Sequence, residues 1–461
     1  MATLHKPAHE YDWGLYPEAE EFLKKEIERF LKNNNLARHI SEKIQQETST
    51  KFFDWIDHIV LPEKEISDSR LRELGFERGK LETEGMRVFL HSKTVFFPVL
   101  LTRKNYTEIA LKPERIDHFL QVIGRGVEIE GGMFSPYRKA VVHKQGSYIL
   151  SSVERNGYNG FVAREPKDNG NYKQALEAFF CRQRHFESDR EGMKDVQELV
   201  EKTLNGLASA RVADAFFRAE RLYWERRNSA GQMQKARQDR LGLGWGNHDH
   251  HTYRSSREHF THLIKIFETM GYECREQFYA GPKAGWGAQI LEHPVCNIVL
   301  FADVDITEHE KNEDFAHHGL HNIMNLGTVG LWVALHGESI LQAGMHHLEA
   351  RFDFEKLRQD LQKIGVNVLP PFSYFDFLKQ AFVQSDIWKV EEKRLKHLLK
   401  NKSITKAQYE KFLREGATGS HLENLQRRQG FKGFNQDSVT AIIKATDPRI
   451  YKGPDLYTRH A

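Results

Sequence analysis

Cysteine is scarce in this sequence, and its placement excludes two kinds of framework. The 461 residues contain three Cys (Cys181, Cys274 and Cys296), and no two of them have the CxxC spacing. Disulfide-built domains and cysteine-rich structural zinc sites both need paired or closely spaced cysteines. We therefore expect neither a disulfide framework nor a structural zinc site.

An excess of charge of one sign is also missing. Lys and Arg number 67 and Asp and Glu number 64, which gives a formal net charge of +3. Proteins that bind nucleic acid or anionic membrane surfaces carry a clear basic excess. The sequence therefore predicts neither a nucleic-acid partner nor a membrane partner.

Long apolar runs are absent as well. No stretch reaches the roughly 18 apolar residues of a membrane span, and the segment Met1–Pro7 lacks a basic region followed by an apolar run. Hydrophobic residues still make up 39% of the chain and aromatic residues 11%, which is enough for a sizeable core. We expect a soluble cytoplasmic protein of roughly two to four domains, and the sequence is compatible with a homodimer.

What the sequence does contain is a dense group of histidines. Three of its 24 His, namely His248, His250 and His251, fall within four residues. In a strand, side chains alternate, so His248, His250, Thr252 and Arg254 would share one face. Burying two imidazoles and a guanidinium without partners is costly. A metal ion for the imidazoles and a carboxylate-bearing substrate for Arg254 would satisfy them.

A repeated unit surrounds this group. Three times, a strand that carries a His is followed by a helix and then by a Gly between two apolar residues. These units run from His58 to Gly75, from His250 to Gly271 and from His347 to Gly365. The Gly has a physical role, because helices often end through a residue in the left-handed conformation. The repeat predicts βαβββ units, which cannot cover their own sheets and therefore pair.

The second and third units share a closer pattern of three alternating polar residues. They are His250, Thr252 and Arg254 in one unit and His347, Glu349 and Arg351 in the other. A His and a Glu two residues apart on a strand can reach the same metal ion. The alternative is an ordinary strand surface on which Glu349 and Arg351 form an ion pair. The same His-x-Glu spacing occurs at His336 and Glu338, after a predicted strand over residues 331–335.

The paired units, together with the dipeptides Asp57-His58 and Asp249-His250, resemble the vicinal oxygen chelate superfamily, which includes the glyoxalases and extradiol dioxygenases. In that superfamily the first strand of a module supplies a metal-binding His. The resemblance implies an α+β fold in which paired βαβββ modules form a half-barrel-like mixed sheet. A helical insert and a helical C-terminal extension complete the predicted fold.

Within the superfamily, the strand with His250, Thr252 and Arg254 is similar to one in the 2-oxoadipate dioxygenase/decarboxylase family. Members of that family use Fe(II), held by two His and one Glu, to oxidise and decarboxylate a 2-oxo acid. The resemblance implies His58 and His250 as imidazole ligands and Glu338 as the carboxylate ligand. The chain departs from the family at Pro62, where the family has an Arg.

These observations predict a mononuclear metal-dependent enzyme, a non-haem Fe(II) dioxygenase/decarboxylase that acts with O₂ on a small 2-oxo or hydroxy acid. The candidate metal ligands are His58, His250, Glu338, His347 and Glu349, and the candidate catalytic residues are Thr252 and Arg254. Two alternatives stay open. One is a glyoxalase-like isomerase or lyase that uses Zn, Ni or Mn, and the other is a non-catalytic binding protein on the same scaffold.

The sequence divides into six segments. They are an N-terminal helix (1–50), a first module (51–124), an irregular segment with a helical insert (125–240), a second module (241–310), a third module-like segment (311–385) and the C-terminal extension (386–461). We further expect a helix over residues 315–326, with His317, His318 and His321 on a polar surface, and a helix over residues 436–445.

Overall fold

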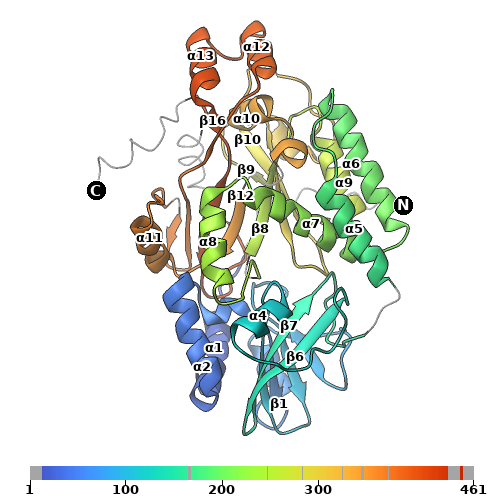
Figure 1. The fold of residues 1–461 in the computed structure, drawn as a ribbon, viewed down its shortest axis with the longest axis vertical. Coiled ribbons are helices and arrows are strands. Elements are labelled where there is room, and N and C mark those ends of the chain that lie inside the picture. Colours follow the sequence, from blue (N-terminus) through green and yellow to red (C-terminus); the bar gives the residue numbers. More distant parts are fainter. Residues whose placement is uncertain are drawn as a thin grey trace.

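The computed structural model describes most of the chain. The described residues are 13–164, 168–246, 248–282, 284–323, 325–343, 347–371, 373–434 and 447–449, with only the backbone given for residues 248, 249, 342, 343, 347–351 and 374. Over these residues the protein is α+β, with two large mixed sheets that do not close into a barrel. The fold class predicted from the sequence is confirmed. Figure 1 shows the two sheets one above the other along the long axis of the molecule.

The first sheet consists of two units joined edge to edge. Its strands are β1 (Ile56–Pro62), β2 (Glu77–Gly79), β3 (Arg87–Leu90), β4 (Val99–Thr102), β5 (Thr107–Leu111), β6 (Tyr137–Gln145) and β7 (Tyr148–Arg155), in the order β2-β3-β4-β1-β5-β7-β6. Helix α3 (Asp68–Glu73) follows β1, and α4 (Ile116–Val122) follows β5. The first strands β1 and β5 pair antiparallel, and each runs parallel to the last strand of its own unit.

The second sheet repeats this plan. Its strands are β8 (His248–Arg254), β9 (Glu273–Tyr279), β10 (Trp286–Glu292), β11 (Val299–Asp305), β12 (His347–Arg351), β13 (Ser373–Phe375), β14 (Leu378–Phe382) and β17 (His421–Arg427), in the order β13-β14-β17-β12-β8-β11-β10-β9. Helices α9 (Phe260–Thr269) and α11 (Phe354–Lys363) follow β8 and β12. Strands β8 and β12 pair antiparallel, so the unit with His250 pairs with the unit of His347.

The glycines of the predicted repeat end the helices as expected. Helices α3, α9 and α11 are followed by Gly75, Gly271 and Gly365, whose φ angles are 89°, 91° and 80°. A fourth unit begins at β5, which carries no His, and its helix α4 is followed by Gly124 at φ 65°. The sequence repeat therefore identified three of the four units, because the fourth lacks the His that marked the others.

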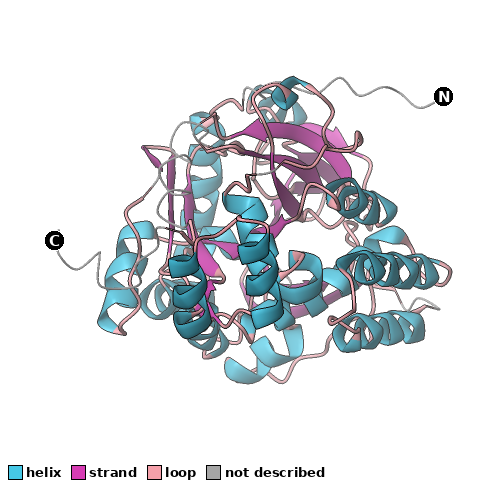
Figure 2. Ribbon diagram, turned by 90° about the horizontal axis from the view of Figure 1, so that it is seen from above, coloured by secondary structure: helices cyan, strands magenta, loops and turns pink. Residues whose placement is uncertain are grey.

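Helices cover one face of each sheet. They are α1 (Pro17–Asn33) and α2 (Asn35–Lys43) near the first sheet, and α5 (Asn169–Cys181), α6 (Asp189–Leu204), α7 (Ser209–Glu225) and α8 (Ser229–Asp239) in the predicted helical insert. Phe30 packs in one core with Ile59 of β1, and Phe217 packs in another with Tyr253 of β8. Figure 2 shows helices packed around the strands. The side chains of His58 and His250 lie on the opposite, inner faces.

Shorter elements complete the structure. They are η1 (Ile44–Thr48), η2 (Phe52–Trp55), η3 (Glu310–Asn312), η4 (Ser339–Ala343), α10 (Thr328–His336), α12 (Glu392–Lys400), α13 (Lys406–Glu415), and the strand pair β15 (Ile387–Trp388) and β16 (Ala417–Thr418). None of the helices in the described residues combines the length and apolar character that a bilayer crossing requires.

Three predicted elements differ from the structure. The predicted strand over residues 331–335 lies inside α10, whose first N–H groups from Gly327, Val329 and Gly330 donate to the carboxylate of Asp305. The part of residues 315–326 that is described contains no helix. The C-terminal extension has helices α12 and α13 but also supplies β17 to the second sheet. The predicted helix over residues 436–445 lies outside the described residues.

Candidate metal centre on the second sheet

The centre of the second sheet brings an imidazole and a carboxylate together on its inner face. His250 lies on β8 and Glu423 on β17, and both residues are buried. The Nε2 atom of His250 is 3.4 Å from the Oε2 atom of Glu423. Two ligands bound at about 2.1 Å to one ion lie roughly 3.0 Å apart in octahedral and roughly 3.4 Å apart in tetrahedral geometry. The separation therefore fits two ligands of a single metal ion.

Neighbouring side chains fix this pair from two sides. The amide nitrogen of Gln380 on β14 donates a hydrogen bond to Oε1 of Glu423. The rings of Phe301 and Phe434 lie 4.6 and 5.7 Å from the imidazole of His250, measured between ring centroids. Gln380 thus orients the carboxylate, while the two phenylalanines shield the imidazole from water. A hydrogen bond that orients a ligating carboxylate and an apolar shell around a ligating imidazole are both typical of metal sites in proteins.

The strand register brings a second imidazole residue to the same place. His347 of β12 pairs with Thr252 of β8 on one side and with His421 of β17 on the other. Glu349 pairs with Glu423. The side chains of His347 and Glu349 lie outside the described part of the structure, so the backbone register alone places these two residues.

Arg254 lies on the same inner face as His250, as the strand alternation predicted. It is buried, and among the described residues its Nε and Nη1 atoms have no hydrogen-bond partner. Its guanidinium carbon lies 5.6 Å from the centre of the Trp332 ring. Burial lowers the pKa of Arg254 to about 10, although Asp303 and Asp305 oppose the shift. The group therefore stays a cation at neutral pH, with N–H donors available for an anion.

Asp303 is a further carboxyl group on this face. It is buried, whereas most Asp side chains in folded proteins face solvent. It lies on β11, where it pairs in register with Arg254 of β8. Burial raises the pKa of Asp303 to about 7, while Arg254 and His250 act in the opposite direction. A carboxyl of this kind can hold or release a proton near neutral pH.

His58 belongs to a different sheet and has different neighbours. Its Nδ1 atom is 2.7 Å from the carboxylate of Asp57, and the ring of Phe161 lies 4.9 Å away. Asp57 in turn receives two hydrogen bonds from Arg155, of 2.6 and 2.9 Å. The structure therefore places the two predicted imidazole ligands, His58 and His250, in separate environments on separate sheets.

Glu338 follows α10 rather than a strand. It is buried, and its Oε1 atom accepts a hydrogen bond of 3.0 Å from the backbone N–H of Ser256. Burial raises the pKa of Glu338. The next residue, Ser339, accepts a hydrogen bond from the backbone N–H of Arg254. Glu338 thus binds the backbone of Ser256, just after β8. The carboxylate that lies beside His250 is that of Glu423.

The sequence contains a signal for Glu423 that the prediction missed. His421 and Glu423 have the same His-x-Glu spacing as the candidates His347 and Glu349, and the two pairs are aligned in the sheet. The charged helices that precede this segment favour a helical extension, which hides the alternation of a strand. Asp303 and Gln380 carry no comparable signal, because only the folded sheet brings them beside Arg254 and Glu423.

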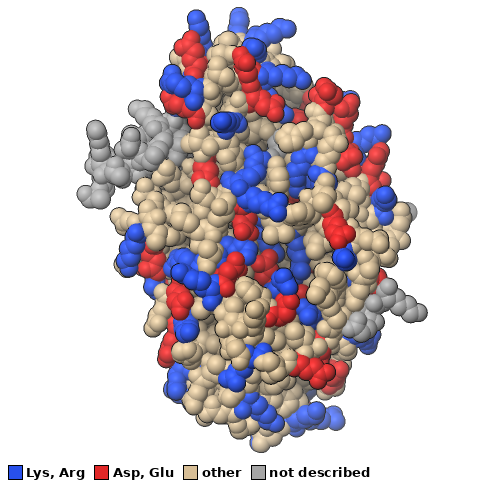
Figure 3. All heavy atoms as spheres, in the orientation of Figure 1, with Lys and Arg blue, Asp and Glu red and all other residues tan. Residues whose placement is uncertain are grey.

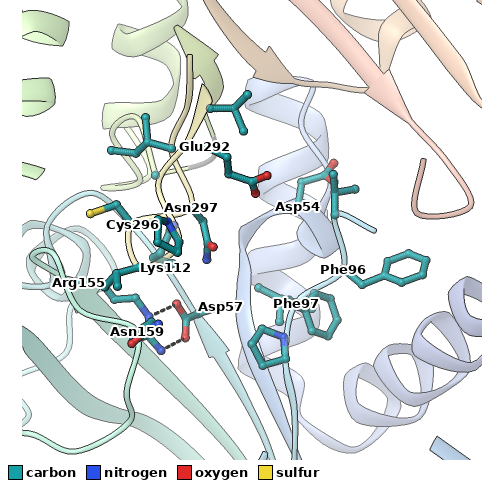
Figure 4. A pocket seen from close by; sticks show the side chains of 18 of the residues that line it. Asp54, Asp57, Phe96, Phe97, Lys112, Arg155, Asn159, Glu292, Cys296 and Asn297 are labelled. Carbon is teal, nitrogen blue, oxygen red and sulfur yellow. Dashed lines mark hydrogen bonds and ion pairs between the residues drawn. The ribbon is translucent and has the colours of Figure 1, made fainter. Parts of the chain in front are cut away.

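A cleft of about 410 Å³ lies between the two sheets and approaches this centre. Its lining includes Val299, which pairs in register with His250, and Phe434, whose ring contacts the imidazole. Figure 4 shows side chains from both halves that line the cleft, among them Asp57, which receives two hydrogen bonds from Arg155. Figure 3 shows that charges of both signs mix on the face of the molecule in view. The cleft gives a small molecule access to the space beside Phe434.

Comparison with known proteins returns matches to solved structures alone. No family model matches the chain, and no curated protein matches it. One similar structure is a triple mutant of 4-hydroxymandelate synthase from Streptomyces coelicolor, with TM-score 0.29 and 12% identity over 87% of this chain and 99% of that one.

Two further solved structures match with similarly low TM-scores and sequence identities. Methylmalonyl-CoA epimerase from Mycobacterium tuberculosis has TM-score 0.23 and 11% identity over 39% of this chain and 87% of that one. The uncharacterized protein YdcJ from Shigella flexneri has TM-score 0.24 and 12% identity over 64% and 85%. Since these scores are low, any function must rest on the geometry of this chain. That geometry defines a protein of paired βαβββ units with a buried imidazole–carboxylate pair.

Proposed function

We propose that this chain is a mononuclear metal-dependent enzyme whose ion is held by His250, His347 and Glu423. The observation that carries the proposal is the separation of 3.4 Å between the ligand atoms of His250 and Glu423. The register of His347 with Thr252 and His421 supports it as the second imidazole. In this proposal His58 and Glu338 have structural roles, and Glu349 is the alternative to His347 at the third position.

The ion we propose is Fe(II), because two imidazoles and one carboxylate leave open positions for O₂ and a bidentate substrate. When bound, it would polarise an oxo group and activate O₂. The substrate class is a small 2-oxo or hydroxy acid. Arg254 supports this class, since its Nε and Nη1 donors lack protein partners among the described residues. Thr252 lies between His250 and Arg254 on the same face and would contact the substrate.

In this reaction the chain's own residues bind, orient and shield. Arg254 holds the substrate carboxylate and thereby directs its oxo group toward His250. Gln380 keeps the carboxylate of Glu423 in one orientation. Phe301 and Phe434 exclude water from one side of the imidazole. Each task needs a group that the fold has already placed, which lowers the entropic cost of reaching the reactive arrangement.

Oxygen consumption tests this proposal. Protein loaded anaerobically with Fe(II) is mixed with a series of small 2-oxo acids, and O₂ uptake and CO₂ release are recorded. We expect uptake that depends on one of these acids. In Arg254→Lys, which cannot make the bidentate contact, KM should rise about 10- to 100-fold. The matched control Arg190→Lys changes an exposed guanidinium and should leave KM unchanged. Absence of acid-dependent uptake would reject the dioxygenase.

A glyoxalase-like isomerase or lyase is a second candidate, and Asp303 favours it. Proton transfer in such an enzyme requires a base near the bound substrate, and Asp303 is a buried carboxyl beside Arg254. Zn, Ni or Mn would then replace Fe(II), and O₂ would not be consumed. Exchange of substrate hydrogen with deuterated solvent, measured by NMR, detects this reaction. Exchange that disappears in Asp303→Asn would establish the isomerase in place of the dioxygenase.

A further inference from the structure

A second group of metal-binding side chains lies at the far edge of the second sheet. It consists of Glu268 in the last turn of α9, Cys274 on the edge strand β9, and His317 in the segment after η3. One ligand atom from each residue lies within 4.8 Å of the other two. Strand β9 is three strands away from β8 in the sheet, so this group is separate from His250 and Glu423.

Two separations in this group lie near those between the ligands of one tetrahedral ion. His317 Nε2 is 2.9 Å from Glu268 Oε1, and Cys274 Sγ is 3.7 Å from the same oxygen. Zinc binds nitrogen and oxygen at about 2.0–2.1 Å and thiolate sulfur at about 2.3 Å, which gives ligand–ligand separations of roughly 3.3–3.7 Å. Small side-chain movements would therefore bring all three atoms to bonding distance.

The other ring nitrogen of His317 is already held by a carboxylate. Its Nδ1 atom is 2.8 Å from Oδ2 of Asp314. Metal-binding histidines commonly donate their second N–H to a carboxylate, which fixes the ring and strengthens the ligand. Glu268 and His317 are exposed and Cys274 is half-buried, so an ion can enter from solvent and keep a water molecule as its fourth ligand.

We propose that Cys274, His317 and Glu268 form a binding site for a zinc-like divalent ion. Thiolate, imidazole and carboxylate are the three ligand types that zinc uses in proteins. On binding, the thiol proton of Cys274 passes to solvent and the sulfur forms a bond to the ion. The ion ties the segment around His317 to the turn between α9 and β9. The proposal differs from the expectation of no structural zinc site, which rested on the absence of closely spaced cysteines; this site uses one Cys and takes its other two ligands from elsewhere in the chain.

The competing explanation needs no metal. An imidazolium of His317 would bridge the carboxylates of Glu268 and Asp314, and the thiol of Cys274 would only donate a hydrogen bond to Glu268. The two explanations differ in what they require of Cys274. A metal site makes its sulfur a bound thiolate ligand, whereas the ion-pair network leaves it a protonated thiol that donates to Glu268.

Cobalt binding to untagged full-length protein distinguishes them. A thiolate bound to Co²⁺ gives an intense near-ultraviolet charge-transfer band, and the proposed centre at His250 and Glu423 contains no Cys. We expect the band to appear by two equivalents of Co²⁺ in the wild type, where the other proposed centre competes for the ion, and by one equivalent in His250→Ala. It should vanish in Cys274→Ser, persist in the control Cys181→Ser, and need at least about tenfold more Co²⁺ in His317→Ala. No band in the wild type, or its persistence in Cys274→Ser, would overturn the site.

Alkylation of the thiols gives a second readout without any substitution. Iodoacetamide modification of each Cys is followed by peptide mass spectrometry with and without two equivalents of Zn²⁺, enough to fill both proposed centres. Zinc should slow modification of Cys274 at least about tenfold, because a bound thiolate is a poor nucleophile toward the reagent. The exposed Cys181 serves as internal control and should react at an unchanged rate. Equal rates for Cys274 with and without Zn²⁺ would reject the proposal. Neither readout depends on the function proposed for His250 and Glu423.

Discussion

At the scale of single residues, the same dipeptide has two different environments in this chain. Asp57-His58 and Asp249-His250 each begin a unit, yet His58 binds its own neighbour Asp57 while His250 meets Glu423. The difference comes from distant partners. Arg155, which lies 98 residues after Asp57, holds that carboxylate and keeps its pKa well below the ordinary range in spite of burial. No local motif distinguishes these two cases.

Gln380 provides a residue-scale prediction. It donates a hydrogen bond to Glu423, so it acts by positioning a ligand. Gln380→Leu should lower the affinity for the proposed ion about 10- to 100-fold, as measured by competition with a metal-sensitive dye. Circular dichroism of the ion-free protein should be unchanged. Gln362→Leu replaces an exposed Gln and is the matched control. Equal affinities of the two variants would show that Glu423 needs no orientation.

At the scale of elements, the helical insert is fastened to β8 by buried charge. Glu220 of α7 accepts hydrogen bonds from Arg182 and Arg184, and the hydroxyl of Tyr253 on β8 lies 3.4 Å from its other oxygen. Burial alone would raise the pKa of Glu220, but Arg182 and Arg184 lower it below its ordinary value. The outer face of the strand that carries His250 is thereby linked to α7.

Loss of this charge should destabilise the protein strongly. Glu220→Gln leaves two buried guanidinium groups without a counter-charge, and the free energy of unfolding should fall by about 3–5 kcal/mol. Urea denaturation measures the effect. The control Glu198→Gln alters an exposed Glu of α6 and should change stability by less than about 0.5 kcal/mol. A small effect of Glu220→Gln, similar to the control, would mean that the insert does not depend on this group.

Elements with clear periodicity were predictable, and two without it were not. Helix α9 buries Leu263, Ile264 and Phe267 at helical spacing, and its existence was predicted correctly. Helix α10 is apolar on all sides, so neither helix nor strand periodicity is visible in it. The start of α10 is fixed by Asp305 of strand β11, whose carboxylate accepts the N–H of Gly327. Strand β17 is buried on both faces but polar at most positions, so it resembled the charged helices before it.

At the scale of the whole molecule, the two sheets are connected through Glu114. This residue follows β5 of the first sheet and is 3.1 Å from Arg221 of α7, and it also accepts from the N–H of Trp245 just before β8. Burial alone would raise the pKa of Glu114, but Arg221, Lys235 and this N–H lower it to about 2. The connection was not predictable, because its partners come from three segments of the chain.

The pH dependence of stability tests this connection. A carboxyl whose pKa is lower in the folded state stabilises that state above its unfolded pKa of 4.5, and the contribution is lost as pH falls toward about 2. Between about pH 6 and about pH 3 the wild type should lose about 2 kcal/mol more unfolding free energy than Glu114→Gln. Urea denaturation at several pH values measures the difference. Parallel curves for both proteins would contradict the account.

The internal duplication also organises the molecule as a whole. Four units pair two by two. In the first sheet, Glu108 of β5 forms an ion pair with Lys139 of β6, with a distance of 2.7 Å between Nζ and Oε1. An ammonium group beside the carboxylate is a poor setting for a metal ion. We therefore place the proposed centre on the second sheet alone, next to the cleft of about 410 Å³ between the halves.

The most direct test of the central claim is the metal content of three proteins purified without chelator. All carry Cys274→Ser, so that the second proposed site does not contribute. The parent and His58→Ala should each hold about one transition-metal ion per chain, whereas His250→Ala should hold almost none. A parent with less than about half an equivalent would contradict the account and favour a non-catalytic binding protein. A result in which His58→Ala loses the ion and His250→Ala keeps it would also contradict the account, because it would place the ion at His58.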